Sequence, residues 1–227
     1  MAEPKQDRAR RTRQVLLRAA AEVFDENGFC GASINKIRER AGVTAGAVYF
    51  HFQSKEGLAR AVILEHAGDL RFPPGPGGLG HLLDMTRYLA EEMQVNVLLR
   101  AGVKLAVEQG ESGLREFTIY EWWIDRFVQE LTVAREMGQL LPDVDEVEFA
   151  RVLMAAYTGT QVMCRISEQH ADLPARIAVM WRYLLPAVAT PEACAALASS
   201  WSASASASAS ASASASAPPC PVGVQID

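Results

Sequence analysis

Residues 33–52 read SINKIRERAGVTAGAVYFHF. Two short stretches with helical periodicity flank Ala41-Gly42-Val43, and glycine readily takes the positive φ that a tight turn needs. Ser33 and Thr44 precede the two stretches as helix N-caps. The segment therefore predicts a helix-turn-helix unit, a motif whose second helix can enter the major groove of DNA.

The second helix of this unit carries the small residues 45–47, which would let it lie deep in a groove, followed by Tyr49 and His51. Lys55 follows at the start of another helix, where its charge and the amide dipoles both suit a phosphate oxygen. The predicted DNA contacts are Ser33, Lys36, Thr44, Ala45, Gly46, Tyr49, His51 and Lys55. Ala45 and Gly46 would meet base edges, and the other residue types suit the backbone. From geometry alone, an ordinary helical hairpin with surface aromatics stays an alternative.

The rest of the chain up to residue 190 also has helical patterns, so we expect an all-α fold. An Arg-rich first helix should end at Asn27-Gly28. The further expected helices span about 54–68, 79–93, 96–108, 118–138, 145–169 and 174–188. The pattern predicts a head at 1–53, a body at 54–190 with a linking helix at 54–72, and a disordered Ser/Ala-repeat tail at 191–227.

Charge is distributed unevenly along the 227 residues. Residues 1–66 carry eleven Lys/Arg and eight Asp/Glu, or +3, whereas residues 67–227 carry eleven and nineteen, or −8. This asymmetry indicates that the head meets a polyanion. No apolar run is long enough for a membrane span, and the N-terminus has no secretory h-region. The four scattered cysteines favour a reducing cytoplasm over a disulfide scaffold.

Catalytic motifs are missing from the sequence. No Walker A motif, GxSxG elbow or metal-binding His spacing occurs. Residues 75–80 satisfy GxGxxG, but they follow prolines where a dinucleotide site would need a strand. We therefore expect no enzyme, no metal and no cofactor.

The head resembles a known family. The matching residues are Phe24, Gly28, Ser33, Ile37, Ala41-Gly42-Val43, Gly46, Tyr49-Phe50-His51-Phe52, Lys55, Glu56 and Leu58. They are similar to the N-terminal signature of the tetracycline-repressor (TetR) family over about residues 10–62. The resemblance implies a homodimeric transcriptional repressor that binds double-stranded operator DNA and responds to a ligand bound in its helical body.

The body resembles the γ-butyrolactone receptor branch of that family. The similar segments are NVLLRAGVKL, EMGQLLPDVD and YTGTQV, together with the stretch around Trp123. The resemblance implies release from the operator by a γ-butyrolactone or a related butenolide or furan, and control of antibiotic production or differentiation. A pseudo-receptor that responds to an antibiotic is the alternative. In that branch a lysine is usual at the position of Ala45, so a cationic contact with DNA is missing here. Arg8, Arg10, Arg11 and Arg13 are candidates to compensate for it at the DNA backbone or minor groove.

Candidate ligand contacts lie in the body. Trp122 and Trp123 are adjacent, so they point about 100° apart and only one can face the interior. The resemblance selects Trp123. The polar candidates are Thr158, Thr160 and Gln161, each of which could instead bond its own helix, and the apolar candidates are Met85, Tyr88, Leu89, Val103 and Val107. We expect dimerisation through about 145–170 and 174–188, with Met154, Met163, Met180 and Trp181 available to pack.

Overall fold

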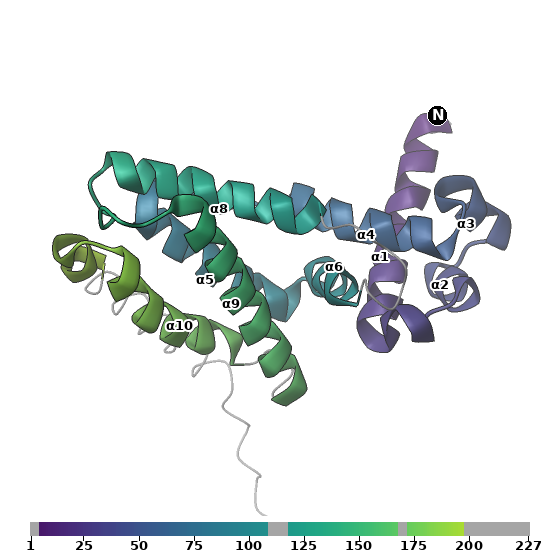
Figure 1. Ribbon diagram of the computed structural model, residues 1–227. Helices are drawn as coiled ribbons and strands as arrows, with labels where there is room; N and C mark the ends of the chain where they lie inside the picture. The colour runs from purple at the N-terminus through teal and green to yellow at the C-terminus, as the bar shows by residue number, and fades with distance from the viewer. Residues whose placement is uncertain (1–4, 109–117, 168–171, 198–227) are drawn as a thin grey trace, which may run out of the picture.

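The computed structural model describes residues 5–108, 118–167 and 172–197, most of which are helical (Figure 1). The helices are α1 (Lys5–Gly31), α2 (Ile34–Ala41), α3 (Ala45–Phe52), α4 (Lys55–Asp69), α5 (Gly78–Val95), α6 (Val97–Val107), α8 (Thr118–Glu136), α9 (Glu146–Ser167) and α10 (Leu173–Val188). Outside them, an isolated bridge joins Leu140 to Ala189. The predicted all-α fold is confirmed. In the described ranges no helix has the length and apolar character of a membrane span.

The head consists of α1, α2 and α3 around one small core. Leu16, Phe24 and Ile37 are fully buried, and Val48 from α3 is 1% exposed. Gly42 adopts the left-handed conformation, with φ 65° and ψ 33°, so the turn between α2 and α3 has the geometry that the sequence predicts. The Ser33 and Thr44 side chains accept hydrogen bonds from backbone N–H groups in the first turns of α2 and α3. The helix-turn-helix prediction is therefore confirmed in its local detail.

The first helix has a break at the residue where the sequence predicts its end. Gly28 is non-helical, with φ 66° and ψ −178°, and a short helical turn continues to Gly31. At the break the backbone N–H of Phe29 donates to Glu108 Oε2 at 3.1 Å. A Cβ at position 28 would lie 3.0 Å from the same oxygen, so glycine permits both the backbone conformation and this close approach.

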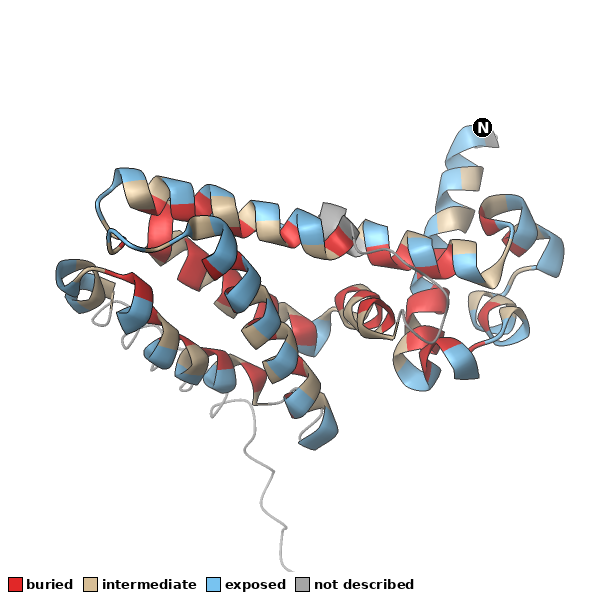
Figure 2. Ribbon diagram, viewed as in Figure 1, coloured by how far each residue is buried: buried red, intermediate tan, exposed pale blue. Residues whose placement is uncertain are grey.

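The body is a bundle of α5, α8, α9 and α10 at the opposite end of the molecule from α1–α3, with α4 and α6 between them (Figure 1). Helix α5 packs against α8 and α10, and α9 packs against the same two helices. Helix α6 packs against both α1 and α4, so it connects the body to the head. Buried residues follow the inward faces of these helices, as expected for amphipathic packing (Figure 2).

The end of the body differs from the expectation in one respect. Residues 191–197 are helical, and Cys194 and Leu197 pack against the core. Thr190 begins this segment: its carbonyl accepts from the Cys194 N–H at 2.9 Å, and its own N–H donates to the Gln139 carbonyl at 2.9 Å. The prediction of a tail beginning at 191 is therefore wrong for these seven residues. The predicted Ser/Ala tail otherwise lies outside the described residues.

Candidate functional sites

The exposed face of α3 is the candidate DNA-reading surface. Ala45 and Gly46 are exposed at its N-terminal end, and Tyr49 and Phe50 are 53% and 80% exposed one turn further along. Residues three or four apart share a helix face, so these four residues form one continuous surface. Phe50 is absent from the predicted contacts, although its spacing from Gly46 places it there.

The remaining polar candidates of the head are accessible to different extents. Ser33 and Thr44 are exposed at the N-termini of α2 and α3. His51 is half-buried, and its ring centroid lies 5.0 Å from that of Phe50 and 6.1 Å from that of Phe52. Contact of these side chains with phosphates stays a prediction.

The two lysines that were predicted to contact DNA make hydrogen bonds within the protein. Lys36 Nζ donates to Asn27 Oδ1 and to the Gly31 carbonyl, both at 3.0 Å. Lys55 Nζ donates to the carbonyls of Phe29 and Ala32 at 3.0 and 3.2 Å and lies 4.2 Å from the centre of the Phe29 ring. Both ammonium groups therefore bind near the end of α1, where helical carbonyls lack partners. Local sequence reasoning could not find the Lys55 bonds, because Lys55 is 26 residues from Phe29.

The N-terminal arginines divide into two groups. Arg8, Arg10 and Arg11 are exposed on α1. Arg13 is half-buried, with one amino group 2.7 Å from a Glu65 carboxylate oxygen on α4. The first three are therefore the accessible candidates for backbone or minor-groove contact, whereas Arg13 holds α1 against the linking helix.

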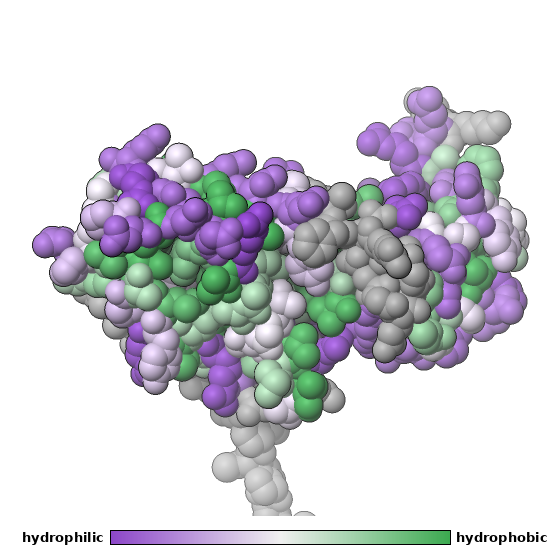
Figure 3. All heavy atoms as spheres, in the orientation of Figure 1, coloured by the Kyte–Doolittle hydropathy of each residue, from purple (hydrophilic) through white to green (hydrophobic). Residues whose placement is uncertain are grey.

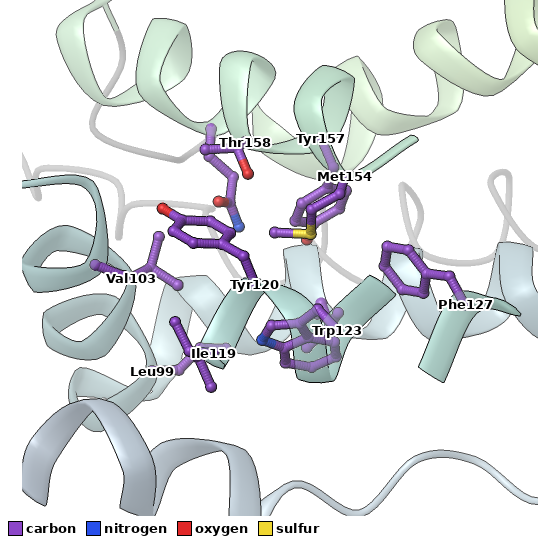
Figure 4. A pocket seen from close by; sticks show the side chains of 12 residues that line it. Leu99, Val103, Ile119, Tyr120, Trp123, Phe127, Met154, Tyr157 and Thr158 are labelled. Atoms are coloured by element: carbon purple, nitrogen blue, oxygen red, sulfur yellow. The ribbon is translucent and has the colours of Figure 1, made fainter. Parts of the chain in front are cut away.

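A cavity with mostly apolar walls lies between α5, α6, α8 and α9 (Figure 4). The closed cavity is small, with about 40 Å³ of free space, and the empty volume of about 500 Å³ around it includes open solvent at the mouth. It is lined by Leu89, Leu99, Val103, Ala106, Ile119, Tyr120, Trp123, Phe127, Met154, Tyr157, Thr158 and Gln161. Five of the nine predicted ligand contacts are among these residues: Leu89, Val103, Trp123, Thr158 and Gln161.

Trp123 occupies the wall that α8 contributes to this cavity. It is 6% exposed, whereas Trp122 is 42% exposed, so the prediction that only one of the two faces inward is confirmed. The Trp123 ring contacts the rings of Trp122, Phe72 and Phe127 at centroid distances of 4.8, 6.0 and 6.2 Å. These contacts fix the plane of the indole against the cavity.

Four predicted contacts lie elsewhere. Met85 is fully buried in the core, and Tyr88 packs edge-on against Phe72 at 5.8 Å. The Thr160 hydroxyl donates to the Ala156 carbonyl at 2.8 Å, within its own helix. Val107 lines a neighbouring cleft. None of these four residues lines the cavity, although each is within four residues of one that does.

Tyr120 and Tyr157 are the polar lining residues that the sequence did not indicate. Burial raises the pKa of both hydroxyls above the ordinary value, and for Tyr157 the Gln161 side chain opposes the shift. Tyr157 and Gln161 are 3% and 6% exposed and lie one helical turn apart. That spacing from Gln161 is the signal that could have identified Tyr157.

The neighbouring cleft has a polar lining and shares two lining residues with the cavity. Its lining includes Val103 and Gln161, which also border the cavity, and three cations, Arg100, Lys104 and Arg165. Arg100 Nε lies 2.9 Å from Asp25 Oδ2, and Lys104 Nζ donates to the Asp25 carbonyl. Helix α6 therefore presents Leu99, Val103 and Ala106 to the cavity and Arg100 and Lys104 to the head.

Comparison with known proteins assigns the family. Residues 16–62 match the model of the bacterial regulatory proteins of the tetR family, and residues 77–190 match that of a tetracyclin repressor-like C-terminal domain. The chain therefore belongs to the TetR family of transcriptional regulators. It is 36% identical over 189 residues to the A-factor receptor protein of Streptomyces griseus, covering 82% of this chain and 67% of that protein.

Solved structures show the same relationship. TylP, a TetR regulator of Streptomyces fradiae, is 37% identical, with a TM-score of 0.75 and coverage of 84% of this chain and 92% of TylP. An ArpA-like γ-butyrolactone receptor is 28% identical, with a TM-score of 0.66 and coverage of 82% and 92%. The protein is a ligand-responsive DNA-binding repressor, and like other TetR regulators it binds operator DNA as a dimer.

Proposed function

We propose that a γ-butyrolactone, or a related butenolide or furan, releases this repressor from its operator in the cytoplasm. We propose that the genes under its control are those of antibiotic production or differentiation. The apolar cavity with Trp123 in its wall is the observation that carries this proposal. The similarity to the A-factor receptor protein and to a γ-butyrolactone receptor supports it. A response to an antibiotic is the second candidate, supported by walls that would also suit other apolar molecules.

In the proposed mechanism, α6 transmits the effect of ligand binding from the cavity to α1 and α4. A ligand that separates the cavity walls would press on Leu99 and Val103 and displace the helix that packs on α1 and α4. Movement of α4 would then change the spacing of the two heads on DNA. A ligand that binds the released conformation about 100-fold better supplies roughly 2.7 kcal/mol, and operator DNA must weaken ligand binding by the same factor.

The proposed dimer surface is the outer face of α9 and α10. On α9 the exposed residues Val152, Ala155, Gly159, Met163 and Ile166 follow helical spacing, and on α10 Val179 and Tyr183 are exposed one turn apart. Hydrophobic side chains gather along α9 in the space-filling view (Figure 3). A twofold dimer would cover this surface and present two heads to a palindromic operator.

Two residues expected at the dimer surface lie elsewhere. Trp181 is 1% exposed, and its indole N–H donates to the Thr86 hydroxyl at 2.8 Å. Met154 lines the cavity. Met163, which is 67% exposed, stays a candidate for the interface.

The test replaces the two neighbouring tryptophans in turn. Trp123→Leu should abolish release of operator DNA by a panel of γ-butyrolactones, butenolides and furans, whereas Trp122→Leu should retain it. Both variants should bind operator like the wild type, because α8 lies outside the head. Gel-shift titration measures both properties. Failure of every member of the panel to release wild-type protein, with release by an antibiotic, would establish the second candidate.

A further inference from the structure

Tyr157 lines the cavity, and its hydroxyl makes no hydrogen bond of normal length and angle with the described residues. The neighbouring Gln161 side chain interacts with the hydroxyl only enough to oppose part of the rise in its pKa. The Tyr157 side chain is 3% exposed, so water does not solvate this hydroxyl freely. Most buried polar groups in native proteins are hydrogen-bonded, and an exception in a binding site indicates a missing partner. A ligand atom in the cavity can supply that partner.

Charge is missing from the described residues that line the cavity. Its polar members are Tyr120, Tyr157, Thr158 and Gln161, and all others are apolar. A carboxylate placed here would lose its hydration without gaining a counter-ion, which is strongly unfavourable in an apolar environment. A neutral ligand avoids this penalty.

Three cationic side chains lie in the neighbouring cleft, which shares Val103 and Gln161 with the cavity. Arg100 binds Asp25 and the carbonyls of Met93 and Gln94. Lys104 donates to the Asp25 carbonyl, and Arg165 lies 4.0 Å from Glu108. These cations are engaged in holding α6 and α9 near the end of α1, so recruiting one for an anionic ligand would cost existing contacts.

The protonation state of Tyr157 follows from its surroundings. Burial raises the pKa of the hydroxyl far above its ordinary value, and Gln161 only partly opposes that shift. The hydroxyl therefore keeps its proton across the physiological range and can act as a donor. Its natural partner is an uncharged acceptor such as a carbonyl oxygen.

We propose that Tyr157 donates a hydrogen bond to a carbonyl oxygen of a neutral lactone, and that the cavity accepts the closed ring but excludes its ring-opened hydroxy acid. The inference rests on the proposed function in taking this cavity as the effector site. It adds the residue that recognises the lactone and the charge state of the ligand.

This selectivity has a consequence for the signal. In lactone hydrolysis water adds to the carbonyl carbon, the ring C–O bond breaks, and the ring oxygen becomes an alcohol. The new carboxylic acid then loses a proton. The product keeps the carbon skeleton but carries a negative charge, so it should leave the cavity. A hydrolytic ring-opening reaction is therefore the class of reaction that would end the response and restore operator binding.

The experiment uses the full chain and a series of γ-butyrolactones with alkyl or acyl chains of about four to eight carbons, each paired with its alkali-opened hydroxy acid at neutral pH. Calorimetry should give about 100-fold weaker binding for the hydroxy acid than for its lactone. Tyr157→Phe should weaken lactone binding about tenfold. Tyr88→Phe is the matched control, because it removes the same atom from a tyrosine outside the cavity, and it should bind like the wild type.

Thermal unfolding without ligand separates recognition from a structural role. Because the Tyr157 hydroxyl has no hydrogen bond of normal geometry to lose, Tyr157→Phe should keep or raise the wild-type Tm, whereas a structural hydroxyl would lower it. Equal lactone binding by Tyr157→Phe and wild type, or equal binding of lactone and hydroxy acid, overturns this inference. The proposed function survives either result, provided that the lactone still releases operator. If no lactone of the series binds, this inference fails, and the proposed function fails with it unless a butenolide or furan releases operator.

Discussion

Arg100 and Asp25 join α6 to α1 through a bond of 2.9 Å between Nε and Oδ2, one residue away from Leu99 in the cavity wall. The two side chains are 23% and 27% exposed, so water screens the pair only in part. Lys104 donates to the Asp25 carbonyl one turn further along α6. If ligand binding shifts α6, the end of α1 must therefore move with it, or the contacts between the two helices must be strained.

Asp25→Asn should weaken the coupling between ligand and operator without removing either site. The neutral amide loses the charge attraction to Arg100, so we expect ligand to weaken operator binding by about tenfold in place of about 100-fold. Gel-shift titration with and without ligand measures this factor. Glu146→Gln is the matched control: Arg135 binds Glu146 at 2.7 Å with similar exposure, but this pair joins α8 to α9 inside the body. Equal loss of coupling in both variants would contradict a specific role for Asp25.

Lys55→Met tests whether this lysine serves the fold or the DNA backbone. The variant leaves the carbonyls of Phe29 and Ala32 without their donor, so we expect a loss of about 1 kcal/mol and a Tm lower by about 2–4 °C. The slope of log binding constant against log salt should stay unchanged. A slope smaller by about 1 would instead identify a phosphate contact. Lys36→Met, at an exposed lysine, should cost less stability.

Ile166→Asp should dissociate the dimer. Ile166 is 75% exposed at the end of the apolar stripe on α9, and a carboxylate buried there against a second copy would lack a partner. Sedimentation should show monomers at micromolar concentration, and operator affinity should fall at least about tenfold because the two heads no longer bind together. Val95→Asp introduces the same charge at a residue that is 78% exposed on α5, and it should remain dimeric.

Trp181→Phe should destabilise the body through the loss of a single hydrogen bond. The indole N–H and the Thr86 hydroxyl are both buried, and the variant leaves the hydroxyl without this donor. We expect a loss of about 1–3 kcal/mol in denaturant unfolding. Combining it with Thr86→Val should cost less than the sum of the two single changes, because they break one shared bond. Strict additivity would argue that the bond contributes nothing.

Lowering the pH should reduce the free energy of unfolding slightly, because Glu146 becomes protonated. The Arg135 guanidinium beside it, with a backbone hydrogen bond, holds the pKa of this carboxyl below its ordinary value of 4.5. A lowered folded-state pKa gives stability that is complete above the unfolded value and is lost as the pH falls through the folded value. With the pair about one-third exposed, we expect less than about 1 kcal/mol. Unfolding curves from pH 7 to 3 should show wild type and Glu146→Gln converging as the pH falls below 4.5.

Local signals in the sequence predicted the head well. Ser33, Gly42 and Thr44 act within three or four residues of themselves, through caps and a left-handed turn, so their roles can be read without knowing the rest of the fold. The apolar periodicity that predicts the buried face of α1 is equally local. The body was harder to predict: the sequence indicated Thr158 and Thr160 alike, but only Thr158 lines the cavity.

The sequence by itself therefore determined the all-α class, the helix-turn-helix unit and the family resemblance, because these depend on short-range patterns and recurrent motifs. The tertiary structure alone decided that Lys55 binds the end of α1, that Arg100 meets Asp25 across 75 residues, and that Tyr157 lines the cavity with its hydroxyl buried and without a hydrogen bond of normal geometry. Helix packing sets these contacts, since a small rotation of α6 or α9 would bring different side chains to the same place.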